Sequence, residues 1–187
     1  MSTTSAMPQT TVSTWKLDPV HSVAEFKVKH MMISNVKGQF TGISGSMILD
    51  EADVTKSRVD MIIEAASINT REAQRDAHLK SADFFDAANH PTIRFQSKAV
   101  KADGPGSLTV TGDLTIRGVT REVVLKIDGP SGENKDPWGN LRRGAEATTR
   151  IKRKDFGLTW NQALETGGVL VGDDVDITLD VQLIKSV

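Results

Sequence analysis

The sequence predicts an all-β fold of roughly eight or nine antiparallel strands with one short helical insertion, at about residues 70–88. Apolar and polar residues alternate through most of the chain, as they do in strands that bury one face and expose the other. The alternating segments are about ten residues long, and turn-forming stretches such as 103–107 and 128–140 separate them.

The strands are placed by this alternation. The last segment shows it best, because every second residue from Val175 to Leu183 is aliphatic. Between Phe40 and Leu49 the alternation changes parity, and the glycines there predict a β-bulge. After a first strand at 14–17, the other alternating segments in chain order are 24–30, 58–68, 92–100, 107–116, 121–128 and 143–151.

The helical insertion is predicted from capping and charge signals. Asn69 can cap a helix while Glu72 returns a bond from the third position, which is a capping box. Asp76 and Lys80 then stand four residues apart in the favourable order. Ser81 can cap a short second turn, which the His90-Pro91 pair ends.

Length and composition indicate one domain over residues 14–187, after a polar tail at 1–13 that we expect to be flexible. The 23 Lys and Arg nearly balance the 24 Asp and Glu, which argues against nucleic acid as a partner. Without cysteine, disulfides, thiolate metal sites and cysteine catalysis are excluded. The polar N-terminus has no secretory signal and no segment is apolar enough for stable membrane insertion, so a cytoplasmic protein is expected.

Residue patterns for catalysis or metal binding are missing. The four histidines have no i, i+4 pair, so a metal site is not expected. Nucleophile-elbow, phosphate-loop and dinucleotide motifs are absent, and the carboxylates fall mostly at solvated strand positions and turns. The basic run 152–155 reads as a solvated edge. We therefore predict no catalytic residues, no cofactor and no enzyme.

Long amphipathic strands can form a sandwich or a closed barrel, and strands of about ten residues suit a barrel wall. The lumen can then be filled by side chains or left open as a narrow apolar tunnel. Phe84 and Phe85 can cap an apolar opening or simply pack in the core. Many residues predicted to face inward are small: Ala24, Ala65, Ser97, Ala99, Gly112, Ala145, Ala147 and Thr149.

Four blocks of the chain together resemble the YceI-like family: 17–31, 68–95, 110–125, and 136–140 followed by 153–161. The resemblance covers residues 15 to 187 and implies an extended, lipocalin-like antiparallel barrel of eight strands with a long hydrophobic tunnel. It also implies a homodimer that binds a polyisoprenoid or similar long-chain lipid, such as an isoprenoid quinone, for transport, storage or sequestration. A protein-interaction module with a filled barrel and a lipid-modifying enzyme remain as alternatives.

Within the blocks, Asp18, His21 and Ser22 can orient a lipid head group or form a turn before a strand, and the turn is favoured. Residues 136–140 form a structured turn, and 153–157 can close the lumen with Phe156 inside. The parity of the strands supplies the predicted ligand-binding residues. They are Phe26, Val28, Met61, Ile63, Phe84, Phe85, Ile93, Phe95, Val110, Leu125, Ala145, Ala147, Phe156, Ile177 and Leu179.

Overall fold

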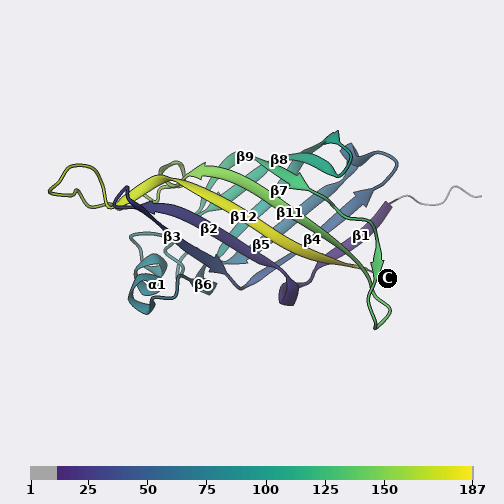
Figure 1. Cartoon of the computed structure of the whole chain (residues 1–187), viewed down its shortest axis with the longest axis horizontal. Helices are drawn as coiled ribbons and strands as arrows, with labels where there is room; N and C mark the ends of the chain where they lie inside the picture. Colours follow the sequence, from purple (N-terminus) through teal and green to yellow (C-terminus); the bar gives the residue numbers. More distant parts are fainter. Residues whose placement is uncertain (1–11, 187) are drawn as a thin grey trace, which may run out of the picture.

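Eight antiparallel strands close into a barrel in the computed structural model, which describes residues 12–186 (Figure 1). The predicted all-β barrel with a short helical insertion is confirmed. In hydrogen-bonded order the barrel strands are β1 (Val12–Leu17), β4 (Ile43–Asp50), β5 (Arg58–Glu64), β7 (Thr92–Gly104), β8 (Ser107–Ile116), β9 (Val119–Asp128), β11 (Leu141–Lys152) and β12 (Val171–Lys185), and β12 closes the ring on β1.

The long strand β12 makes the barrel an extended one. One edge of β12 pairs with β11 from Asp174 to Ile184. The other edge is shared, because β2 (Val23–His30) pairs with its first part and β1 with residues Leu183–Lys185. β2 continues through a tight turn into β3 (Ser34–Phe40), so the β2–β3 hairpin prolongs the wall beyond β1.

The parity change between Phe40 and Leu49 has a different origin from the predicted bulge. β3 ends at Phe40 and β4 begins at Ile43, and the two strands pair with different neighbours. Thr41 and Gly42 form the corner between them, where a Cβ on Gly42 would lie 2.6 Å from a carboxylate oxygen of Glu64. Gly42 therefore serves a close approach at the corner, Gly45 pairs regularly with Met61 inside β4, and the bulge prediction is wrong.

A bulge does occur in β7, where the register shifts between Ser97 and Ala99. It reverses the parity of the rest of the strand, so Val100 is buried and Ala99 is exposed. The prediction that Ala99 faces inward is therefore wrong. No glycine marks this bulge in the sequence, so the alternation was predicted to continue unbroken from Ile93 to Ala99.

The helical insertion begins later than predicted. Helix α1 spans Ala73–Lys80 and follows the two-residue strand β6 (Ile68–Asn69). Its N-cap is Glu72, whose carboxylate accepts the backbone N–H groups of residues 74 and 75, so the capping box on Asn69 is wrong. Asn69 instead accepts the N–H of Arg71 in a turn that delays the helix. Asp76 likewise bonds back to Thr70 rather than forward to Lys80.

Short elements complete the chain. Single turns of 3-10 helix lie at Pro19–His21, Val54–Lys56, Ala65–Ser67 and Arg153–Phe156, and β10 (Asn134–Lys135) pairs with the start of β11. The predicted tail lies largely outside the described residues. Its last two residues belong to β1 and pair with β4, so the domain begins earlier than predicted. Within residues 12–186, no helix is long and apolar enough to cross a membrane.

An ion-pair network ties together the loops at the β1 end of the barrel. The Arg142 guanidinium donates to the carboxylates of Asp18, at 2.6 Å, and Asp136, at 2.7 Å. Asp18 also accepts from the His21 ring and from the N–H of Val20, which sets the turn before β2. The bonds from Arg142 and then His21 lower the pKa of Asp18 from 3.8 to about 2. Arg142, as the largest cause, likewise holds the pKa of Asp136 far below its ordinary value.

This network predicts how stability depends on pH. Because both carboxyl pKa values are depressed in the folded state, the network stabilises the fold above about pH 4 and is lost as the pH falls toward 2. Arg142→Met should lower the free energy of unfolding at neutral pH, and its deficit relative to the wild type should shrink in acid. Urea unfolding across this pH range measures both effects.

Arg150→Met is the matched control, because Arg150 pairs with Asp176 at 2.6 Å on an exposed part of the wall. An exposed pair is screened by solvent and contributes little to stability. A deficit for Arg142→Met that stays constant from neutral pH to pH 2 would contradict the assignment of this stability to the two carboxylates.

Candidate functional site

Two apolar cavities lie one after the other inside the barrel. The larger has a volume of about 160 Å³ and the smaller about 80 Å³. Each exceeds the ~10–15 Å³ that one water molecule needs. The wall surface that faces both cavities is apolar, so a water molecule inside would find no hydrogen-bond partners on that surface. The chemistry of both cavities therefore favours an apolar guest over water.

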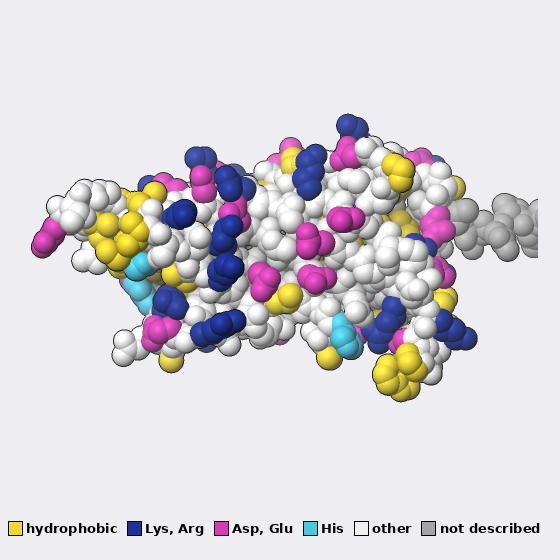
Figure 2. Space-filling view, viewed as in Figure 1, with side chains coloured by type: hydrophobic (Ala, Val, Ile, Leu, Met, Phe, Trp, Pro, Cys, Tyr) yellow, Lys and Arg dark blue, Asp and Glu magenta, His cyan; other side chains and the backbone are white. Residues whose placement is uncertain are grey.

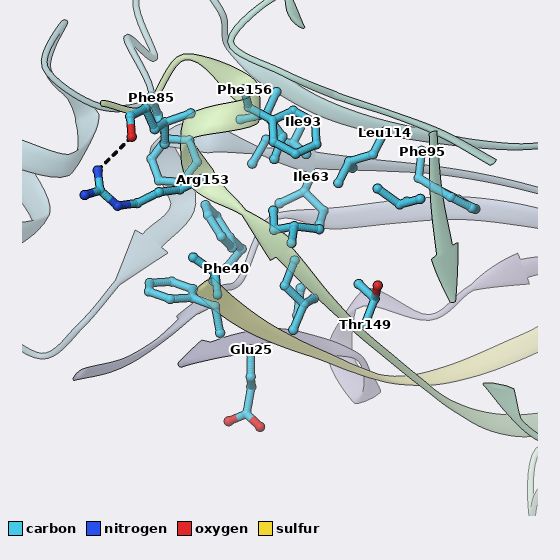
Figure 3. Close-up of a pocket in the computed structure, with 18 of the residues that line it drawn as sticks. Glu25, Phe40, Ile63, Phe85, Ile93, Phe95, Leu114, Thr149, Arg153 and Phe156 are labelled. Atoms are coloured by element: carbon cyan, nitrogen blue, oxygen red, sulfur yellow. Dashed lines mark hydrogen bonds between the residues drawn. The ribbon is translucent and has the colours of Figure 1, made fainter. Parts of the chain in front are cut away.

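The larger cavity lies in the half of the barrel that β2, β3 and the helical insertion surround (Figure 3). A chain of aromatic rings forms part of its wall. The ring of Phe40 is 5.7 Å from that of Phe26 and 5.6 Å, edge-on, from that of Phe85. Aliphatic side chains from other strands complete the wall. These include Ile63, Ile93, Leu114, Ile116, Ile151 and Ile177.

The smaller cavity lies in the half that β1 and β4 surround, at the other end of β12. Small side chains on β11 leave this space open, because Ala145 and Ala147 point into it. Val110 of β8 lies on the same wall. The remaining wall residues include Leu17, Met47, Leu49, Val59, Val100, Leu108, Ile127, Val181 and Leu183.

Four residues line both cavities and form the waist between them: Met61 of β5, Phe95 of β7, Leu125 of β9 and Leu179 of β12. A glycine lets the Phe95 ring lie against the wall. A Cβ on Gly112 would be only 2.5 Å from this ring, so the ring occupies space that any other residue would fill. A single long guest would have to pass this waist to use both cavities.

The structure places all fifteen residues predicted to bind ligand on the cavity walls. Val110, Ala145 and Ala147 line the smaller cavity alone, and the other twelve line the larger cavity or the waist. Phe84 and Phe85 both reach the larger cavity, although they lie in turns after α1 and not in a helix. That any of the fifteen residues contacts a ligand stays a prediction.

Several wall residues were not in the predicted set. Phe40 stands at the start of the parity change that was read as a bulge, and it was not assigned to the lumen. Leu79 is on α1, and Leu158 and Val171 flank a long loop that has no alternation. Glu25 adjoins the cavity only through its backbone, since its carboxylate points away in Figure 3.

Arg153 lies at the end of the larger cavity, and the expectation that run 152–155 is a solvated edge is wrong for this residue. Its side chain is only 5% exposed. The guanidinium donates to the backbone carbonyls of Gly172, Leu158 and Trp160 at 2.7–2.8 Å, and more weakly to Val171. Burial lowers the pKa of Arg153, but a guanidinium remains charged in proteins. With its donors aimed at these carbonyls, Arg153 ties the loop at 157–170 to the start of β12 at the barrel end and is not aimed at the guest.

The helical insertion covers the same end. The ring of His78 meets those of Phe84, at 5.1 Å, and Trp160, at 4.7 Å, both edge-on. The Phe84 and Trp160 rings are 5.3 Å apart, so the insertion and the loop held by Arg153 share one aromatic contact. Phe156 is buried beneath them, where the sequence placed it.

Asp18, His21 and Ser22 lie outside both cavity walls. They form the turn before β2, which was the favoured interpretation. Asp136 organises the 136–140 turn by accepting the N–H groups of Trp138 and Asn140. Among the described residues, no cluster of three or more His, Asp or Glu side chains could hold a metal ion.

Comparison with known proteins agrees with this architecture. The YceI-like domain model matches residues 15–183. The UPF0312 protein of Ectopseudomonas mendocina (strain ymp) is 42% identical over 139 residues, which are 74% of this chain and 72% of that protein. The crystal structure of the Campylobacter jejuni YCEI protein is 33% identical, with a TM-score of 0.71 over 86% of this chain and 91% of that one.

Two structures of lower identity share the fold. BcnA of Burkholderia cenocepacia is 23% identical, with a TM-score of 0.75 over 89% of this chain and 98% of that one. A polyisoprenoid binding domain from Saccharophagus degradans is 15% identical, with a TM-score of 0.65 over 92% and 98%. The family model covers the barrel from β1 to β12, and relatives of 42% and 33% identity agree with it. The chain therefore belongs to the YceI-like domain family.

Proposed function

We propose that this protein binds a polyisoprenoid or similar long-chain lipid inside the barrel, as a carrier or store and not as an enzyme. The observation that carries the proposal is the pair of apolar cavities in line along a closed barrel. An apolar lumen left unfilled loses the dispersion contacts that a packed core would make. A chain-like apolar guest restores these contacts without needing a hydrogen-bond partner.

The shape of the lumen supports a narrow, flexible guest. The waist of Met61, Phe95, Leu125 and Leu179 would exclude a rigid polycyclic molecule from the smaller cavity, whereas an isoprenoid tail can thread it. A cavity of about 150 Å³ holds a guest the size of benzene, so the two cavities as they stand accommodate a short part of such a tail, and a longer tail needs the wall side chains to move apart. The polyisoprenoid binding domain of Saccharophagus degradans, which has the same fold, supports this class of ligand.

Isoprenoid quinones are our first candidates within this class, because the quinone ring can remain at the Arg153 end of the larger cavity while the tail enters the lumen. Selectivity would then come from the width of the waist and from the groups near the Arg153 end. A homodimer is part of the same proposal and rests on the family resemblance. Sedimentation velocity of the purified protein measures it directly.

Solvent extraction followed by mass spectrometry tests the proposal, together with native mass spectrometry of the freshly purified protein. A stoichiometric isoprenoid or other long-chain lipid is the expected result, and it would identify the ligand class. A protein that arrives empty and also takes up no added long-chain quinone would sink the proposal and favour a filled-barrel interaction module. Chemical alteration of a bound lipid over time would favour the lipid-modifying enzyme.

Filling the smaller cavity should block long-chain binding. Ala145→Trp and Ala147→Trp each point an indole into this cavity of about 80 Å³ and so fill it. Binding of a long-chain quinone should fall by at least about tenfold, since the tail loses its contacts in the smaller cavity. Fluorescence titration measures the affinity, and circular dichroism checks the fold.

Thr148→Trp is the control, because Thr148 directly follows Ala147 on β11 and its side chain is exposed. It adds the same ring to the outer face of the same strand. Equal affinity for all three variants and the wild type would show that the lumen is not the site.

A further inference from the structure

The β2–β3 turn exposes three consecutive apolar side chains at the end of the barrel. Met31 is 41% exposed, Met32 56% and Ile33 81%. Val169, in the loop held by Arg153, adds a fourth exposed apolar side chain at 38%. We call these four residues the apolar tip, and Figure 2 shows apolar side chains gathered at this end of the molecule.

The backbone of the turn makes this exposure unusual. Met31 and Met32 have φ angles of 51° and 60°, and the N–H of Ile33 donates to the carbonyl of His30 across the turn. Asn-Gly is the preferred pair where both central residues have positive φ, because it adopts this region with less strain and leaves the turn polar. Methionine is disfavoured at both positions, because positive φ angles strain its backbone and exposure to water is unfavourable for its apolar side chain. The stability of the fold therefore does not explain these two methionines.

The tip is a fixed part of the molecule. The N–H of Met31 donates to the carbonyl of Leu170 at 2.7 Å, which joins the hairpin to the loop. The Met32 side chain lies against Gly168 of the same loop. The Arg153 guanidinium in turn holds this loop through buried bonds. The apolar side chains are therefore presented on a braced end and not on a free strand edge.

The tip continues directly into the wall of the larger cavity. Val28 lines the cavity and lies on β2 just before the turn. Val171 also lines the cavity, and it pairs with His30 in the ladder. A lipid tail at the tip would therefore be next to the residues that receive it inside the barrel.

The charges around the tip favour an anionic surface. Lys29 and Lys37 lie on the two strands of the hairpin, are exposed, and form no ion pair among the described residues. Glu165 in the loop adds one negative charge, and Asp173 and Asp174, which follow Gly172 beside Lys29, are paired with Lys154 and Lys152. Exposed methionine and isoleucine flanked by free lysines suit the boundary of a bilayer, where apolar side chains enter the acyl region and lysines meet acidic head groups.

We propose that the apolar tip docks onto an anionic lipid bilayer and that the ligand enters or leaves the larger cavity there. This inference rests on the proposed lipid-binding function, since it gives the route by which the guest is exchanged. Trp138, 81% exposed in the 136–140 turn, lies at the other end of β12 and serves as the comparison.

The test uses the full chain and vesicles of phosphatidylcholine with about one-third phosphatidylglycerol, read by co-sedimentation. The triple variant Met31→Asn, Met32→Gly, Ile33→Ser removes the apolar side chains and supplies the preferred turn pair. It should bind at least about tenfold more weakly while its melting temperature stays equal or rises. Lys37→Ala should weaken binding about fivefold on these vesicles and have no effect on pure phosphatidylcholine.

Trp138→Ser is the matched control, because it removes an exposed apolar side chain from the opposite end. Vesicle binding that depends on Trp138 and not on the tip would overturn the proposal, as would a wild type that does not bind the vesicles. A triple variant that turns a dimer into a monomer without changing vesicle binding would instead assign the tip to a second copy of the chain.

Equilibrium binding of a soluble short-chain quinone, without vesicles, separates this proposal from the function it rests on. The triple variant should keep the wild-type affinity in that assay and lose only the transfer of a long-chain quinone from vesicles. Wild-type affinity for the soluble quinone without any vesicle binding would reject the docking site and leave the lipid-binding function standing.

Discussion

Strand β12 is the element on which the other parts of this barrel depend. It is longer than the other described strands, and two different strands share one of its edges. Its apolar face follows the lumen from Val175 at the larger cavity, through Leu179 at the waist, to Leu183 at the smaller cavity. A register slip of one residue would turn this face to solvent and the polar face inward, so the ladder with β11 determines the chemistry of the whole lumen.

The lumen remains open because large side chains lie against the wall over small ones. The Phe95 ring lies over Gly112, and the Phe26 ring lies over Gly38, each within 3 Å of where a Cβ would be. Alanines on β2 and β11 leave further space between these rings. A core with the same number of rings but no glycines beneath them would push the rings toward the axis and fill the barrel.

Charged side chains organise the ends of the barrel and leave its interior apolar. Arg142 joins two loops at the β1 end, and Arg153 ties a long loop across the other end. Both guanidinium groups use their donors on the protein itself.

The sequence by itself determined the all-β class, the direction of most strand side chains and the fifteen residues now found on the cavity walls. Period-two alternation carries most of this information, because an amphipathic strand turns one face to the interior. Phe84, Phe85 and Phe156 were placed instead by the helical insertion and by the 153–157 block. The tertiary structure decided the features that the alternation of apolar and polar residues does not encode. The corner at Gly42, the bulge before Val100 and the burial of Arg153 depend on partners distant in sequence, as does the waist made by four separate strands. Whether a barrel of these strands is filled or hollow depends on how rings and glycines meet across neighbouring strands, and only the folded chain brings them together.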